Sequence, residues 1–132
     1  MEFDPSAPIW VQLLSEFARR IVVGEWAPGS KVPGVREVAA DLGVNPNTAQ
    51  RALAELERQG LCRSERTSGR FVTDDLARID QERAALTQEA ADQFIGRAQG
   101  FRMPLRQAQQ LISERWALHA DPDHHAAGAE GA

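Results

Sequence analysis

Two short helical patterns joined by a very short turn constrain this fold more than any other feature. The first, VREVAADL at residues 35–42, repeats its apolar residues at helical spacing and is followed by Gly43, a residue typical of helix C-termini. The second starts at Asn45 and Pro46, which suit the N-cap and the first helical position, and Gly60 closes it. Two helices separated by so short a turn containing glycine predict a helix-turn-helix.

The flanking segments extend this motif into a winged helix. Large apolar residues recur three and four apart over residues 9–23, which predicts a first core helix, and the run GEWAPGSKVPG then breaks it. After the helix-turn-helix, LCRS and RFVT have strand character and are separated by ERTSG, so we expect a β-hairpin that forms the wing. The predicted fold class is α+β and mostly α, with an N-terminal winged helix-turn-helix.

The remainder of the chain predicts two more helices. The long charged pattern from residue 75 carries only a thin apolar strip, and such a strip usually needs a partner helix. Gly100 and Pro104 bracket a break before the last helical pattern. We expect residues 1–74 to form the DNA-binding domain, 75–118 a two-helix dimerisation segment and 119–132 a disordered tail. The interface residues predicted for a homodimer are Leu76, Ile79, Leu86, Phe94, Ile112 and Trp116.

Charge and composition narrow the function classes. The 132-residue chain has a formal net charge of -4, which argues against a protein that coats nucleic acid nonspecifically. Residues 45–72 nevertheless carry five arginines against three glutamates, a local excess of +2. No signal peptide is recognisable, and no apolar run approaches the roughly 20 residues that span a bilayer, so we expect a cytoplasmic protein without a membrane partner.

The third helix has the residue types of a DNA reader. Its inward stripe is predicted to be Ala49, Ala52, Leu53 and Leu56, which leaves Asn47, Thr48, Gln50 and Arg51 on the outside of its first turns. Such side chains suit phosphate oxygens and the edges of bases. Double-stranded DNA is therefore the expected partner, and two paired copies would present two such helices to a roughly palindromic operator.

The matching residues resemble bacterial transcription regulators of the GntR type and, among them, the small YtrA-like subfamily. The run KVPGVREVAADLGVNPNTAQRALAELERQGL carries the resemblance, preceded by PIWVQLLSEFARRIVVGEWAPGSKVP and followed by SGRFV. It covers residues 8–73 closely, and GFRMPLRQAQQLISE is similar to the subfamily's short C-terminal helix. The resemblance implies dimerisation through two C-terminal helices, a repressor, and often control of a transporter operon.

The resemblance also assigns individual residues. The family's arginine at the start of the second helix falls on Arg36, its recognition-helix contacts include Asn45, and its wing glycine falls on Gly69. Two departures are Gly34, where the family usually has serine, and Arg70, which replaces a threonine and would add a phosphate or minor-groove contact. The full predicted DNA-binding set is Arg36, Asn45, Asn47, Thr48, Gln50, Arg51, Arg66, Ser68, Gly69 and Arg70.

A winged helix that binds a protein is the main alternative, and it predicts apolar or acidic residues outside the third helix. Arg36 could instead pair with Glu37 or Asp41, and Arg66 and Arg70 could be plain solubilising residues. No motif of an enzyme, cofactor site or metal site is present in an ordered pattern, and we expect none of the three. A small-molecule effector would have to bind between the C-terminal helices or at their junction with the DNA-binding part.

Single residues also have simpler readings. Trp10, Trp26 and Trp116 are expected to pack rather than bind a ligand, with Trp116 at the dimer interface. Cys62 is expected to be a small apolar strand residue, since redox sensing would need a depressed thiol pKa. The tail offers metal-ligand types without a fixed geometry at His119, Asp121, Asp123, His124 and His125.

Overall fold

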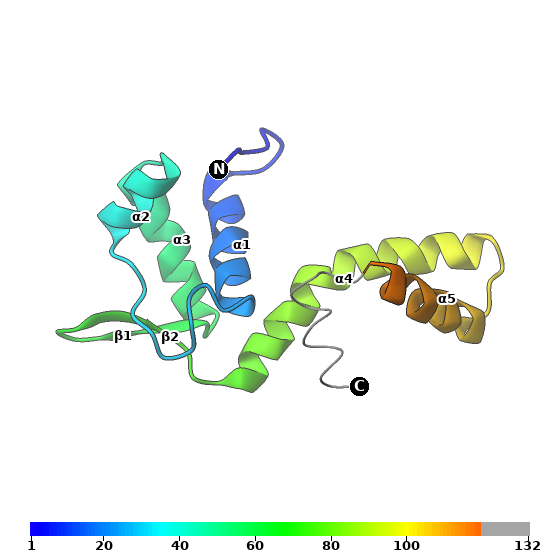
Figure 1. Ribbon diagram of the computed structural model, residues 1–132. Helices are drawn as coiled ribbons and strands as arrows, with labels where there is room; N and C mark the ends of the chain where they lie inside the picture. Colours follow the sequence, from blue (N-terminus) through cyan, green and yellow to red (C-terminus); the bar gives the residue numbers. More distant parts are fainter. Residues whose placement is uncertain (120–132) are drawn as a thin grey trace. The chain divides into compact units, whose positions relative to one another are not determined.

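The computed structural model describes residues 1–119 and confirms the predicted fold class. The elements are α1 (Ile9–Val22), α2 (Val35–Leu42), α3 (Pro46–Arg58), β1 (Cys62–Glu65), β2 (Gly69–Val72), α4 (Leu76–Gly100) and α5 (Leu105–Leu118) (Figure 1). By compactness the chain divides into one unit, Met1–Gln88, and a second that starts at Glu89, within α4. The predicted disordered tail and its histidines 124 and 125 lie outside the described residues.

The core of the first unit forms where α3 packs against α1 and α2 (Figure 1). The stripe predicted for α3 is confirmed, since Leu53 and Leu56 are fully buried, as are both of its alanines. Leu13 and Phe17 of α1 meet them, and Trp26 stacks on Phe17 with ring centroids 5.2 Å apart. No polar or charged side chain is buried within residues 1–119, so apolar burial supplies the cohesion of this unit.

The turn of the helix-turn-helix follows the local chemistry of its residues. Gly43 has φ 69°, a left-handed conformation that glycine adopts without strain, and its N–H donates to the carbonyl of Ala39. At the start of α3 the Asn45 side chain accepts a 2.8 Å hydrogen bond from the Asn47 N–H, and Pro46 occupies the first turn. The predicted stop, cap and start are all confirmed.

The wing also pairs with residues 30–32, a segment for which the sequence predicted only the end of the first helix. β1 and β2 form an antiparallel hairpin in which Cys62 faces Val72 and Glu65 faces Gly69. Residues 30–32 run along the other edge of β2, where the Val32 N–H donates to the Arg70 carbonyl and the Val72 N–H to the Ser30 carbonyl, both at 2.8 Å. This pairing holds the wing against the chain that leads into α2.

The first turns of α4 belong to the winged-helix unit. Arg78 donates a 2.9 Å hydrogen bond to the carbonyl of Gln59, the C-cap of α3, and Arg83 donates one of 2.9 Å to the carbonyl of Val22 at the end of α1. Helix C-termini leave carbonyls unpaired and carry partial negative charge, so arginine suits both positions. Ile79, predicted at the dimer interface, is instead 4% exposed and joins this core. It is unavailable to a second chain.

The second unit contains the rest of α4 together with α5. Ala98 of α4 and Ala108 of α5 are both buried and line the same small cavity of about 110 Å³. The connecting turn closes with a 2.9 Å hydrogen bond from the Met103 N–H to the Ala98 carbonyl, and Arg102 takes a left-handed φ of 59°. Within residues 1–119, none of the helices combines the length and apolar character needed to cross a membrane.

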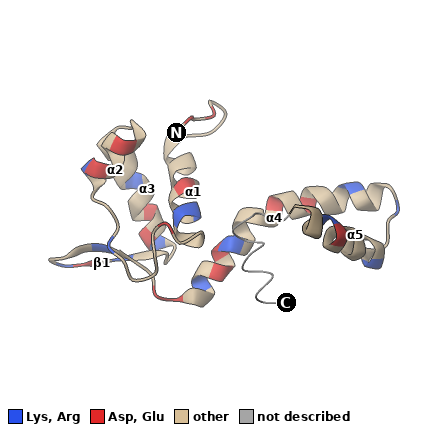
Figure 2. Cartoon of the chain, viewed as in Figure 1, with Lys and Arg blue, Asp and Glu red and all other residues tan. Residues whose placement is uncertain are grey.

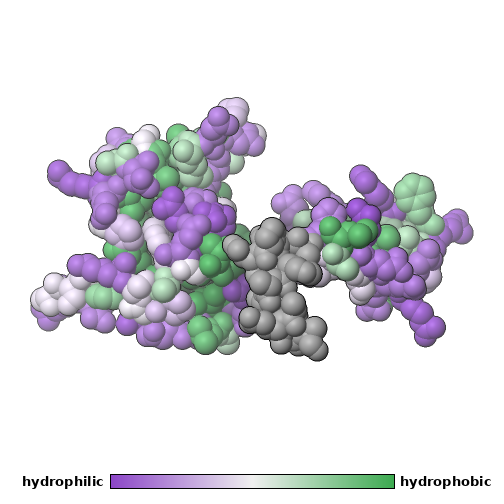
Figure 3. All heavy atoms as spheres, viewed as in Figure 1, coloured by the Kyte–Doolittle hydropathy of each residue, from purple (hydrophilic) through white to green (hydrophobic). Residues whose placement is uncertain are grey.

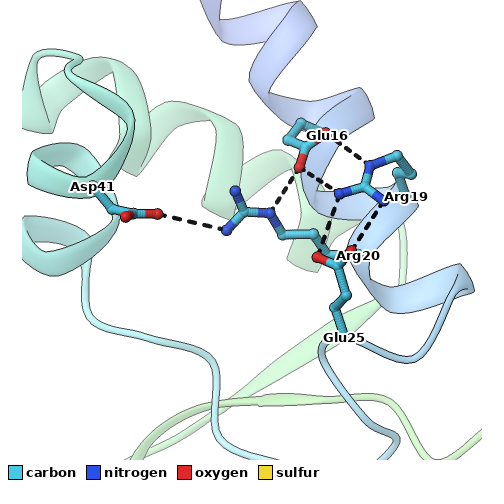
Figure 4. A network of polar contacts seen from close by, with 5 residues as sticks. All are labelled: Glu16, Arg19, Arg20, Glu25 and Asp41. Carbon is cyan, nitrogen blue, oxygen red and sulfur yellow. Dashed lines mark hydrogen bonds and ion pairs between the residues drawn. The ribbon is translucent and has the colours of Figure 1, made fainter. Parts of the chain in front are cut away.

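A network of charges links α1 to the turn after it and to α2 (Figure 4). Glu16 accepts hydrogen bonds from Arg19 at 2.9 Å and from Arg20 at 2.8 Å. Arg19 also bonds Glu25, and Arg20 approaches Asp41 of α2 at 4.0 Å. The hydrogen bond from Arg19, more than any other contact, lowers the pKa of Glu16 from 4.5 to about 2.

This network predicts a pH-dependent contribution to stability. The lowered pKa means that ionised Glu16 stabilises the fold above pH 4.5, and that this contribution is lost as the pH falls toward 2. Glu16→Gln should therefore lower the free energy of unfolding by about 1 kcal/mol at pH 7, with the difference vanishing near pH 2. Urea unfolding across this range measures it, and Glu25→Gln, whose side chain is 52% exposed, should cost less. A difference that stayed constant with pH would contradict the assignment.

Candidate nucleic-acid interface

The outer face of α3 presents the predicted reading residues to solvent. Asn47, Gln50 and Arg51 are exposed, and Thr48 is partly buried. Because the opposite face is buried against α1 and α2, the whole helix is held with this side outward. Asn45 is exposed as well, but its side-chain oxygen already caps α3, so only its amide NH₂ is left to donate to a ligand.

The basic side chains of the first unit fall into two groups. Within residues 1–88, all of which the structure describes, seven arginines form ion pairs with carboxylates, namely Arg19, Arg20, Arg58, Arg63, Arg70, Arg78 and Arg83. The other four basic side chains form no ion pair and no side-chain hydrogen bond, and we call them the unpaired cations: Lys31, Arg36, Arg51 and Arg66. Acidic and basic residues both occur along α1 and α4, so neither helix forms a purely basic face (Figure 2).

The unpaired cations lie on the helix-turn-helix, on the wing and on the segment that pairs with the wing. Lys31 lies on the strand-like segment beside β2, Arg36 in the first turn of α2, Arg51 on α3 and Arg66 in the turn of the hairpin. The alternative role for Arg36, an ion pair with Glu37 or Asp41, is not seen, and Asp41 approaches Arg20 instead. Nothing in the sequence pattern had indicated Lys31, because its position depends on the pairing of residues 30–32 with β2.

A hollow of about 690 Å³ separates the start of α2 from the wing. Its lining includes Lys31, Gly34, Gly69 and Arg70, and one carboxylate, that of Glu37. Gly34 is the N-cap of α2 and provides no side-chain hydrogen bond to the first turn. Free backbone N–H groups at a helix N-terminus favour anions, so the hollow suits a phosphate group.

Arg70 does not have the free side chain that the sequence suggested. Its guanidinium lies 3.2 Å from the carboxylate of Glu57 on α3, and its side chain is only 18% exposed. A hydrogen bond from Ser64 is the main cause that lowers the pKa of Glu57, with a smaller contribution from Arg70. Glu57 thus ties both strands of the wing to α3, and Arg66 is the wing arginine left available.

Trp10 and Cys62 are two further residues for which the sequence predicted only a packing role. Trp10, expected only to pack, lies beneath Arg51, whose guanidinium carbon is 4.2 Å from the centroid of the indole ring. Cys62 is buried, and burial raises the pKa of its thiol to about 11 although Arg70 acts in the opposite direction. A raised pKa disfavours the reactive thiolate, so the simpler reading of Cys62 as an apolar strand residue stands.

The second unit carries an apolar groove of about 310 Å³. It is lined mainly by Phe94, Leu111, Ile112 and Trp116, and the last two are 46% and 67% exposed. Apolar residues come to the surface among hydrophilic ones over these helices (Figure 3). The other predicted interface residues, Leu76 and Leu86, are also exposed, although they belong to the first unit.

Comparison with known proteins identifies the family. Residues 12–72 match the family model described as bacterial regulatory proteins, gntR family. The chain is 37% identical over 94 residues to the uncharacterized HTH-type transcriptional regulator YhcF of Bacillus subtilis, an alignment that covers 71% of this chain and 78% of that protein. The chain belongs to the GntR family.

Further comparisons agree with this assignment. The GntR-family chain is 35% identical over 77 residues to the HTH-type transcriptional repressor YtrA of Bacillus subtilis, covering 57% of this chain and 59% of YtrA. A GntR family regulator from Listeria monocytogenes has a solved structure that matches with a TM-score of 0.72 and 32% identity, over 85% of this chain and 98% of that one. The DNA-binding domain of AraR, solved in complex with operator ORX1, matches with a TM-score of 0.50 and 28% identity, over 55% of this chain and 93% of that one.

These matches place the GntR-family chain among transcriptional regulators with a winged-helix DNA-binding domain. Its relatives bear the names of regulators rather than of enzymes.

Gly34 leads to a prediction about the start of α2. A Cβ at Gly34 would meet no atom within 4 Å, and φ −63° with ψ 157° suits any residue. Gly34→Ser should therefore supply the missing cap and raise the free energy of unfolding to about 0.5–1 kcal/mol above that of Gly34→Ala, measured by urea denaturation. Gly34→Ala adds the Cβ without the hydroxyl and should give no such gain. Equal stabilities for the two variants would show that no cap forms.

Proposed function

We propose that this GntR-family regulator binds a specific double-stranded DNA site through α3 and represses transcription there. The observation that carries the proposal is the position of the unpaired cations of the first unit, because Arg36, Arg51 and Arg66 lie on the helix-turn-helix and the wing, and Lys31 lies on the segment paired with β2. Phosphate binding requires cations that are not already neutralised within the protein. The excess of carboxylates elsewhere in the chain weakens nonspecific binding to DNA. Tight binding therefore requires contacts that depend on the DNA sequence.

Each part of the winged helix has a distinct role in this proposal. α3 enters the major groove, where Asn47 and Gln50 bond base edges or phosphates and Arg51 reaches a base. Lys31, Arg36 and the N-terminus of α2 hold the DNA backbone, which fixes the register of α3. The wing adds a contact to phosphate or minor groove through Arg66, with Ser68 and Gly69 beside it.

The comparisons support DNA as the partner and repression as the outcome. AraR, whose DNA-binding domain matches this chain, has been solved with an operator, and YtrA is named as a repressor. The resemblance to the YtrA-like subfamily further supports a transporter operon as the target. The competing winged helix that binds a protein requires an apolar or acidic outer face on α3, whereas Asn47, Gln50 and Arg51 are exposed there.

We further propose that two copies pair and bind a palindromic operator. The apolar groove of the second unit gives a second copy a largely apolar surface to cover, lined by Phe94, Leu111, Ile112 and Trp116 together with Arg115 and His119. Pairing would place two α3 helices on half-sites roughly one turn of the DNA apart. Ile79 takes no part in this interface because it is already buried.

The DNA-binding proposal predicts a large effect from two substitutions on α3. Asn47→Ala combined with Arg51→Ala should weaken binding to DNA from the protein's own promoter region by about 100-fold, since two base or phosphate contacts are lost. Fluorescence anisotropy at near-physiological salt measures this, and circular dichroism checks that the fold is intact. Arg106→Ala removes an exposed charge on α5 and should change affinity little. Unchanged affinity of the double variant would remove α3 as the reading helix.

The pairing proposal predicts a change in assembly from one substitution on α5. Ile112→Asp places a carboxylate in the apolar groove and should convert the dimer to a monomer in sedimentation velocity runs, because burying an unpaired charge is costly. Gln109→Asp adds the same charge at an exposed position of α5 that does not line the groove and should leave the dimer intact. A wild-type protein that sediments as a monomer would contradict the pairing itself.

A further inference from the structure

Arg51 is held by an aromatic ring from a different helix. Trp10 is the second residue of α1, and the centroid of its ring lies 4.2 Å from the guanidinium carbon of Arg51 on α3. Two other arginines lie over aromatic rings, Arg20 at 5.6 Å and Arg63 at 5.8 Å, and both also form ion pairs. Arg51 forms no ion pair or hydrogen bond in the described part of the chain, so the ring is its one strong contact.

The nearest carboxylate on α3 does not capture Arg51. Glu55 lies one turn further along the helix, and its oxygens accept hydrogen bonds from Arg58 and Gln59. Those bonds, led by the one from Arg58, lower the pKa of Glu55 to about 2, while Arg51 contributes only through its charge at a distance. The donors of Arg51 are therefore not committed within the protein.

The contact with the Trp10 ring restricts the guanidinium without using its donors. A guanidinium that lies over an aromatic ring is attracted through its flat face, whereas its N–H groups point outward in its own plane. The side chain loses rotamer freedom when the protein folds, so less is lost when DNA binds. The donor fork of arginine matches the O6 and N7 atoms of guanine in the major groove.

We propose that Trp10 is a positioning residue that holds Arg51 in place to bind the O6 and N7 atoms of one guanine. The proposal rests on the proposed binding of DNA by α3 and specifies one base of the site. Trp10 is partly buried, and under this proposal it both packs against the protein and positions Arg51.

The test begins with the full chain and a randomised duplex library, from which the wild-type protein selects its preferred site. Each guanine of that site is then replaced, one at a time, by 7-deazaguanine, which lacks the N7 acceptor. Dissociation constants for both duplexes give a discrimination ratio for wild type, Arg51→Ala, Trp10→Leu, Trp10→Phe and the double variant Trp10→Leu with Arg51→Ala. Loss of folded protein cancels in this ratio, because one preparation is measured on two duplexes.

One guanine should stand out in these measurements. At that guanine the wild-type protein should bind the unmodified duplex about tenfold more tightly than the 7-deazaguanine duplex. The reason is that 7-deazaguanine lacks one of the two acceptors of a bidentate arginine contact. Arg51→Ala should remove that discrimination, Trp10→Leu should remove most of it, and Trp10→Phe should retain most of it because the aromatic face remains. In the Arg51→Ala background, Trp10→Leu should have no further effect on the ratio.

Other results would overturn the proposal in distinguishable ways. If Trp10→Leu weakened binding to both duplexes equally and left the ratio at its wild-type value, Trp10 would be a packing residue only. If Arg51→Ala weakened binding without changing discrimination at any guanine, Arg51 would contact phosphate rather than a base. If the wild-type protein enriched no sequence from the library, the proposed function itself would fail.

Discussion

Burial of one face of α3 is the constraint on which the rest of the structure depends. Ala49, Ala52, Leu53 and Leu56 are fully buried against the neighbouring helices, so α3 has one rotation that keeps its apolar residues from water. That rotation places Asn47, Gln50 and Arg51 outward. The face proposed to read DNA is therefore a consequence of packing, and Gly43 and Asn45 define the turn that leads into the helix.

Charge pairing then decides which cations a ligand can reach. The first unit contains enough carboxylates to neutralise most of its arginines, and several of these pairs serve the fold, as Glu57 does between α3 and Arg70. The unpaired cations remain on the helix-turn-helix, on the wing and on the segment that pairs with the wing. A chain with a net charge of -4 can thus present a local basic surface on its winged helix. This arrangement favours specific over nonspecific binding.

Local signals explain what the sequence could predict and what it could not. The helices, the cap at Asn45, the hairpin and the buried stripe of α3 all follow from spacing and turn chemistry within a few residues, and the structure confirms them. Ile79 was predicted at the dimer interface but lies in the core, because an apolar strip has the same residue spacing whether it packs on the domain's own core or on a second chain. The ion pair of Arg70, the contact of Trp10 with Arg51 and the position of Lys31 join segments far apart in the chain, so no local pattern indicates them.

The central claim is that this winged helix recognises a particular DNA sequence. The most direct measurement is a gel-shift titration of the purified full chain against DNA from its own promoter region, with excess nonspecific competitor at near-physiological salt. Sequence-specific binding should give a discrete shift that survives the competitor, because base contacts from α3 add to the phosphate contacts of the unpaired cations. Absence of a shift even at low salt, or a shift that the competitor abolishes, would contradict it.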